Sequence, residues 1–114
     1  MVVEDCLFCG IVAGDIDADV VHVTDRTVAF RDLDPQAPTH VLVVPRDHYA
    51  NAAELAAGDP QASAELVATA AAVATAEGHT DYRLVLNTGA GSGQSVFHTH
   101  LHLLAGRPFS WPPG

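Results

Sequence analysis

Three histidines near the end of the chain are spaced two residues apart, in the run His98-Thr-His-Leu-His-Leu-Leu. In a strand every second side chain lies on the same face, so His98, His100 and His102 would share one side. Three imidazoles on one face gain nothing from packing together, which indicates a functional site. Two kinds of chemistry fit this spacing. The rings can bind one zinc ion, as in a metal-dependent hydrolase, or one ring can act as a nucleophile that its neighbours orient and protonate.

A glycine-rich segment precedes these histidines. Residues 87–95 read Asn-Thr-Gly-Ala-Gly-Ser-Gly-Gln-Ser, which offers backbone N–H groups and hydroxyls suited to a phosphate. The chain carries fourteen acidic residues against five arginines, for a net charge of -9, so a bound phosphate must be held by local donors. This acidity argues against nucleic acid as a partner, because nucleic-acid binding depends on clustered Lys and Arg. The loop and the histidines together predict phosphoryl or nucleotidyl transfer through histidine.

Cys6 and Cys9 are a second group able to do chemistry. Their Cys-x-x-Cys spacing matches half of a tetrahedral zinc site. Two cysteines this close do not make a disulfide scaffold. A thioredoxin-like redox pair would follow a strand, and no strand pattern precedes these residues.

The elements that must position these residues follow from composition and periodicity. The chain has 114 residues, of which 48% are apolar, and we expect one domain spanning residues 1–114. Its apolar runs fall short of the ~18 residues that cross a bilayer, and its start lacks the features of a signal peptide. These patterns predict a cytoplasmic protein with no membrane partner. The expected elements are a short helix over 6–13, a hairpin of strands 20–23 and 27–31, a buried strand over 40–44, a long helix from Pro60 to near Gly78, and strands 82–86 and 96–104.

The histidine run resembles the signature of the histidine-triad (HIT) superfamily, and other segments are similar to its Hint branch of nucleoside phosphoramidases. Two positions depart from the family pattern: Thr99 replaces an apolar residue, and Arg46 stands where Lys is common. The resemblance implies an α+β fold with a five-stranded antiparallel sheet, one long helix and a short N-terminal helix. It also implies a homodimer, across which the sheet continues. The similar segments are Phe8, residues 29–32, 35–40, Asn87, 93–98 and 111–114.

The resemblance also implies an activity, the hydrolysis of purine nucleoside 5'-phosphoramidates with no organic cofactor. His100 would attack the α-phosphorus to form a nucleotidyl-histidine, which water then hydrolyses. His102 and Ser95 would contact the phosphoryl and leaving groups, and His40 would orient the triad.

A purine nucleotide would be held by an apolar slot for the base, by Asp32 at the ribose hydroxyls and by the glycine-rich loop at the phosphate. Trp111 would contact the substrate from the C-terminal segment, which in the relatives packs beside the partner's active site. The residues that the resemblance implies for substrate binding are Leu7, Phe8, Ile11, Phe30, Asp32, Leu33, Asn87, Gly93, Gln94, Ser95, His100, His102 and Trp111.

Relatives that carry the N-terminal cysteine pair complete a structural zinc site with the His of a Pro-x-x-His motif and the first triad histidine. The resemblance therefore implies a closed zinc site made of Cys6, Cys9, His48 and His98. Three other activities remain open at this stage: a dinucleoside polyphosphate hydrolase or phosphorylase of the same superfamily, a hydrolase with catalytic zinc in the triad, and a nucleotide-binding regulatory protein.

Overall fold

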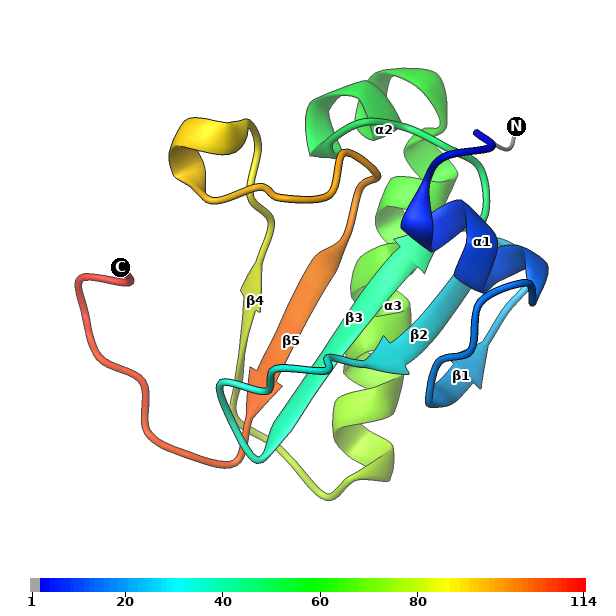
Figure 1. Ribbon diagram of the computed structural model, residues 1–114. Coiled ribbons are helices and arrows are strands. Elements are labelled where there is room, and N and C mark those ends of the chain that lie inside the picture. The colour runs from blue at the N-terminus through cyan, green and yellow to red at the C-terminus, as the bar shows by residue number, and fades with distance from the viewer. Residues whose placement is uncertain (1–2) are drawn as a thin grey trace.

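The computed structural model describes residues 3–114, which form five strands and three α-helices (Figure 1). The strands build one antiparallel sheet in the order β1-β2-β3-β5-β4, which confirms the predicted α+β fold class. The elements are α1 (Leu7–Ala13), β1 (Val20–Val23), β2 (Thr27–Arg31), β3 (Thr39–Pro45), α2 (Ala52–Gly58), α3 (Pro60–Ala76), β4 (Tyr82–Val85), the 3-10 turn η1 (Ala90–Ser92) and β5 (Leu101–Ala105).

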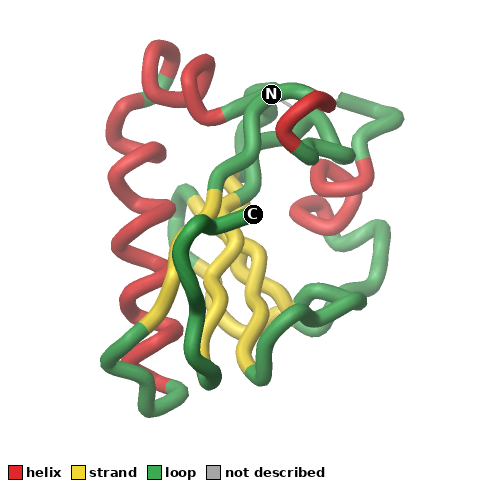
Figure 2. Tube along the Cα trace, turned by 90° about the vertical axis from the view of Figure 1, so that its left-hand side faces the viewer, coloured by secondary structure: helices red, strands yellow, loops and turns green. Residues whose placement is uncertain are grey.

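The long helix α3 covers one face of the sheet (Figures 1 and 2). The Asp59 side chain caps it by accepting the Ala62 N–H at 3.1 Å, and Pro60 occupies its first turn, where no backbone donor is needed. The alternating side chains of the strands divide between two cores, because successive residues of a strand face opposite sides. The core under α3 contains Ala29, Val41, Val43, Leu66, Ala70, Val73, Leu101 and Leu103.

The opposite face is covered by α1. Its Phe8 packs edge-on against Phe30 of β2, with ring centroids 5.5 Å apart. Val28, Leu42 and Val44 complete this second core. The helix has seven residues and covers only part of this face (Figure 1).

Two elements differ from the sequence prediction. The last strand begins at Leu101 and not at residue 96, because the Thr99 N–H and hydroxyl bind the Tyr49 carbonyl at 2.7 and 2.9 Å and draw this segment away from the sheet ladder. The alanine-rich region holds a separate helix, α2, which was not anticipated. It ends before Pro60, because a residue that precedes proline avoids helical geometry, and Asp59 adopts an extended φ of -149°.

No helix within residues 3–114 combines the length and the apolar character needed to span a bilayer.

Candidate active site and metal centre

The triad histidines lie on the α1 side of the sheet, although only His102 belongs to a strand. The Phe8 ring stands 6.0 Å from the His98 ring and 5.0 Å from the His100 ring, and the His100 and His102 rings are 5.0 Å apart. His102 pairs in register with Leu42 of β3, so the central strands fix its position.

One hydrogen bond determines which nitrogen of His100 carries the proton in the neutral ring. Its Nδ1 lies 2.8 Å from the carbonyl oxygen of His98. A carbonyl only accepts, so Nδ1 carries the proton. The neutral ring then keeps an unshared electron pair on Nε2, which is the form a nucleophile requires.

His40 and His102 are joined by a hydrogen bond in which the donor and the acceptor can be assigned. The Gln36 N–H donates to Nδ1 of His40 at 3.0 Å, so the His40 proton resides on Nε2. That Nε2 lies 2.9 Å from Nδ1 of His102 and 3.4 Å from a carboxylate oxygen of Asp32. His102 thus accepts at Nδ1 and carries its own proton on Nε2.

Burial keeps these rings uncharged near neutral pH. It lowers the pKa of His102 to about 4, and His100 and His40 add to the effect while Asp32 opposes it. Burial also lowers the pKa of His40, partly offset by Asp32 and Asp34. Both rings therefore serve as hydrogen-bonding groups and not as fixed cations.

Asp32 is not neutralised by the arginines near it in sequence. Arg31 binds Glu77 at 2.6 Å and Arg26 binds Glu65 at 2.9 Å. One carboxylate oxygen of Asp32 accepts the Asp34 N–H at 2.8 Å, and the other faces His40.

A cleft of about 260 Å³ joins these polar groups to an apolar wall. A pocket with apolar walls and a few converging polar groups is typical of small-molecule sites. The predicted residues that line it are Leu7, Phe8, Ile11, Phe30, Asp32, Leu33, Ser95, His100 and His102. Lining residues that the sequence analysis missed are Ile16, Asp17, Ala18, Arg31, Leu42 and Val96, most of which carry no chemical signal of their own.

Four predicted substrate residues lie outside this cleft wall. Gln94 is buried, and its amide donates to the carbonyls of Ala50 at 2.7 Å and Val96 at 3.1 Å, so it holds the glycine-rich loop in shape. Asn87 lies beside Gly93, whose φ is +103°, and a Cβ built on that glycine would lie 3.9 Å from the Asn87 amide nitrogen. Trp111 is 84% exposed in the C-terminal segment.

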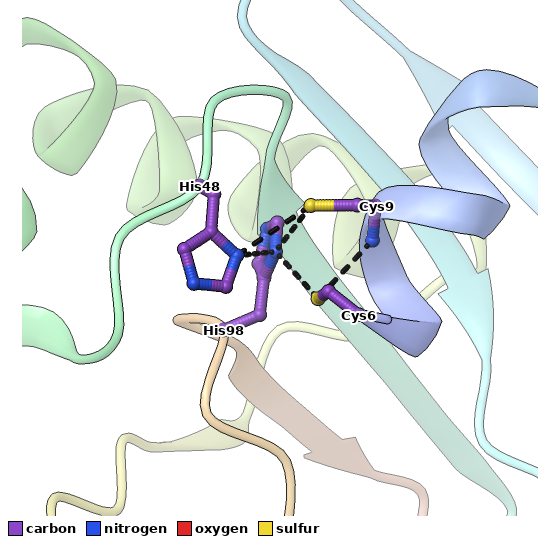
Figure 3. A group of neighbouring side chains, drawn as sticks. All are labelled: Cys6, Cys9, His48 and His98. Atoms are coloured by element: carbon purple, nitrogen blue, oxygen red, sulfur yellow. Dashed lines mark hydrogen bonds between the residues drawn. The ribbon is translucent and has the colours of Figure 1, made fainter. Parts of the chain in front are cut away.

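Cys6, Cys9, His48 and His98 converge on one point, as the sequence predicts (Figure 3). His98 Nδ1 lies 3.3 Å from Cys6 Sγ, 3.5 Å from Cys9 Sγ and 3.2 Å from His48 Nδ1. A tetrahedral zinc ion with ordinary bond lengths separates S and N ligands by about 3.5 Å and two N ligands by about 3.3 Å. The group therefore has the dimensions of a metal site and could hold a metal ion.

The His98 tautomer also suits a metal. Its Nε2 lies 2.9 Å from the Pro45 carbonyl, so Nε2 carries the proton and Nδ1 presents its lone pair to the two sulfurs. A carbonyl behind a ligating histidine is a common supporting contact in metal sites. Two N–H groups donate to the sulfurs, from Val3 to Cys9 Sγ and from Cys9 to Cys6 Sγ. Without a metal, burial raises the pKa of the Cys9 thiol.

Asp32, His40 and His102 also bring three metal-capable groups together. Here the tautomer opposes binding, because the Gln36 N–H places the His40 proton on Nε2, the atom that faces the other two groups. The Asp32 cluster is therefore suited to holding a proton, whereas the cysteine cluster could hold a metal ion.

Comparison with known proteins places these features in a family. The HIT domain model matches residues 13–109, which is most of the chain. The chain belongs to the HIT domain family. Its histidine triad and its Cys-x-x-Cys pair agree with the predicted resemblance.

Relatives of this HIT protein match along nearly its whole length. An uncharacterized HIT-like protein of Synechococcus elongatus is 46% identical over 112 residues, covering 97% of this chain and 98% of the relative. The purine nucleoside phosphoramidase of Escherichia coli is 40% identical over 107 residues, covering 92% of this chain and 90% of the relative. A HIT family hydrolase from Legionella pneumophila superposes with a TM-score of 0.92 at 46% identity, covering 96% of this chain and 100% of that chain.

Proposed function

We propose that this HIT protein hydrolyses purine nucleoside 5'-phosphoramidates through a covalent nucleotidyl intermediate on His100. The observation that carries the proposal is the hydrogen bond from His100 Nδ1 to the His98 carbonyl, which leaves Nε2 with a lone pair at the wall of the cleft. The relative named as a purine nucleoside phosphoramidase supports the substrate class.

The cleft suggests how the substrate is held. The apolar wall around Phe8 and Phe30 takes the purine base, and Asp32 accepts hydrogen bonds from the ribose hydroxyls. Ser95 lies at the same cleft and binds the phosphoryl group. Asn87 and Gly93 add donors from the loop that the buried Gln94 holds.

In the first step the lone pair on His100 Nε2 attacks the α-phosphorus. The P–N bond breaks with its electron pair staying on the amine nitrogen, which takes the proton of His102 Nε2–H while a water molecule returns a proton to that Nε2, so His102 stays neutral and a hydroxide ion is left. His40 orients this step by donating its Nε2–H to His102 Nδ1. In the second step water attacks the phosphorus, gives its proton to that hydroxide and releases the nucleotide together with neutral His100. Dividing the displacement between two nucleophiles replaces one difficult step with two easier ones.

Mass spectrometry of protein mixed briefly with adenosine 5'-phosphoramidate and quenched in acid tests this proposal. An adenylyl adduct should form on the wild-type protein and be absent from His100→Ala. His102→Ala should turn over slowly and accumulate the adduct or the unreacted substrate. His22→Ala, which changes a histidine on the edge strand β1, is the matched control and should behave as wild type. The proposal would be refuted if the wild-type protein formed neither AMP nor the adduct.

The chain forms one domain, and we propose that two copies of it pair. Strand β4 is an edge of the sheet. Tyr82 in this strand is 38% exposed, and Leu86, which directly follows it, is 41% exposed. Pairing along this edge would continue the sheet and give the exposed Trp111 a partner surface to contact. The presence of two free cysteines is consistent with a reducing cytoplasm as the site of action.

We propose zinc as the ion for Cys6, Cys9, His48 and His98. Two sulfurs and two imidazole nitrogens at these distances suit its tetrahedral preference. Zinc with four protein ligands has no open position, so it supplies folding stability and takes no part in the steps above. The cluster would tie the N-terminal segment to the loop after β3 and to the segment before β5.

A further inference from the structure

The segment after β5 is attached to the loop that leads into β3, close to the point where β5 ends and β3 begins (Figure 1). The Arg107 Nε–H donates to the Gln36 carbonyl at 2.9 Å. Beside this bond, Gly106 adopts a φ of +97°, and a Cβ built on it would lie 2.9 Å from Pro38 Cβ. The two segments are thus in direct contact at two successive residues.

Gln36 is the residue that determines the His40 tautomer. Its N–H donates to His40 Nδ1 at 3.0 Å, and its carbonyl accepts from Arg107. These two groups lie on either side of the same Cα, in the two peptide planes that meet there. A shift of the carbonyl that displaces this Cα therefore also moves the N–H that faces the imidazole. Gln36 is exposed, and its side chain donates only to the Asp34 carbonyl in the same loop, at 3.0 Å.

Arg107 is itself held in position. Its guanidinium carbon lies 4.3 Å from the centre of the Phe109 ring, and its Nη1 donates to the Pro108 carbonyl at 2.9 Å. Cation–π stacking and a local hydrogen bond reduce the freedom of the long side chain, so the bond to Gln36 costs less entropy to form. Arg83 also stacks on Phe109, at 5.2 Å, but donates to Ser110 and not to the β2–β3 loop.

We propose that Arg107 is a positioning residue for the His40–His102 pair and acts through the backbone of Gln36. The inference rests on the proposed function, in which His102 must carry its proton on Nε2. If the Gln36 N–H moves away, His40 is free to carry its proton on Nδ1 and no longer donates to His102. Proton transfer to the leaving amine then slows, while the cleft that binds the nucleotide stays as it was.

A pair of neutral substitutions isolates the hydrogen bond. Arg107→Gln places an amide nitrogen at the chain position of Nε and keeps the donor. Arg107→Met has similar length and no donor. Both remove the charge and the guanidinium stack, so their difference reports the bond to Gln36 alone. Arg83→Met is the control for losing a cation over Phe109.

We expect Arg107→Met to lower kcat by about threefold with an unchanged KM, the effect of one exposed hydrogen bond. Arg107→Gln should retain most of the wild-type kcat, and Arg83→Met should match the wild type. Equal losses in Arg107→Met and Arg107→Gln would overturn the proposal, because charge or stacking would then be responsible. A loss confined to KM would overturn it as well.

Nitrogen NMR of the histidine rings tests the proposal without any substrate, so it stands apart from the proposed function. In the wild type, His40 should show an unprotonated, hydrogen-bonded Nδ1 and a protonated Nε2. Arg107→Met should shift the His40 Nδ1 signal and the Gln36 amide signal, and Arg107→Gln should restore both toward their wild-type positions. Identical His40 and Gln36 signals in all variants would overturn the proposal, whether or not phosphoramidates are cleaved.

Discussion

Removing metal from the cysteine cluster should lower stability far more than it lowers catalysis. The other proposed ligand atoms lie 3.2 to 3.5 Å from His98 Nδ1, close to the edge lengths of a zinc tetrahedron, so an ion could bind without rearranging the fold. Nearly all of its binding free energy then adds to the free energy of unfolding. At a free zinc concentration a thousand times the Kd, that addition is about 4 kcal/mol.

The corresponding shift in melting temperature follows from the size of the protein. For a chain of 114 residues, each kcal/mol changes Tm by about 4 °C, so chelation should lower Tm by about 15 °C. Burial raises the pKa of the Cys9 thiol, so zinc must displace a proton from it. This proton alone makes the affinity rise about tenfold per pH unit below the thiol pKa.

Calorimetry of zinc-loaded and chelated protein measures the shift in Tm and its dependence on pH, and Cys9→Ser provides the matched control. The chelator should leave the Tm of Cys9→Ser nearly unchanged. Phosphoramidate turnover, measured well below the lower Tm, should survive chelation within about tenfold, since the proposed steps need no metal. An unchanged wild-type Tm would refute the structural role, and immediate loss of all activity below Tm would show that the metal is catalytic.

Two further changes test other parts of the structure. The pKa of His102 is about 4 in the folded protein and about 6.5 when unfolded, so the unfolded state gains a proton first as pH falls. These two pKa values correspond to a decrease of about 2.6 kcal/mol in the free energy of unfolding between pH 6.5 and 4, and solvent screening of the partly exposed ring reduces the expected decrease to about 1–2 kcal/mol. Urea titrations should show a smaller decrease in His102→Asn, and equal pH slopes would contradict this account. In α3, Leu66 is 2% exposed and Val67 is 49% exposed. Leu66→Ala should cost about 3 kcal/mol in urea unfolding and Val67→Ala less than about 0.5, and comparable losses would mean that α3 does not pack as described.

Much of the architecture could be predicted because local signals agree with the tertiary environment. The hairpin of β1 and β2, the apolar β3 and the capped, alanine-rich α3 each carry a clear pattern. The start of β5 could not be predicted, because it depends on the bond between Thr99 and the Tyr49 carbonyl, a contact between segments far apart in sequence. Helix α2 was missed because the high alanine content extends across its boundary with α3 and hides the interruption at Asp59.

The residues of the candidate site likewise divide into those that the sequence predicts and those that it does not. Side chains with distinctive chemistry, such as the triad and the cysteine pair, stand out by type and spacing. His48 carries no such signal by itself and was found through the resemblance to relatives. The cleft residues Ile16, Leu42 and Val96 look like ordinary core positions, and only the chain path brings them to the cleft. The contribution of Gln36 is made by its backbone, which residue type does not reveal.

The assignment of protons to His40, His98 and His100 rests on main-chain groups: the Gln36 N–H, the Pro45 carbonyl and the His98 carbonyl. Side-chain substitution cannot delete a carbonyl, and among the standard amino acids only proline deletes an N–H. Most mutations at position 36 or 45 therefore preserve the protonation pattern as long as the chain path is kept. The cleft lining can consequently drift in sequence, or be redesigned for another nucleoside, while the same ring nitrogen of each of these histidines keeps the proton.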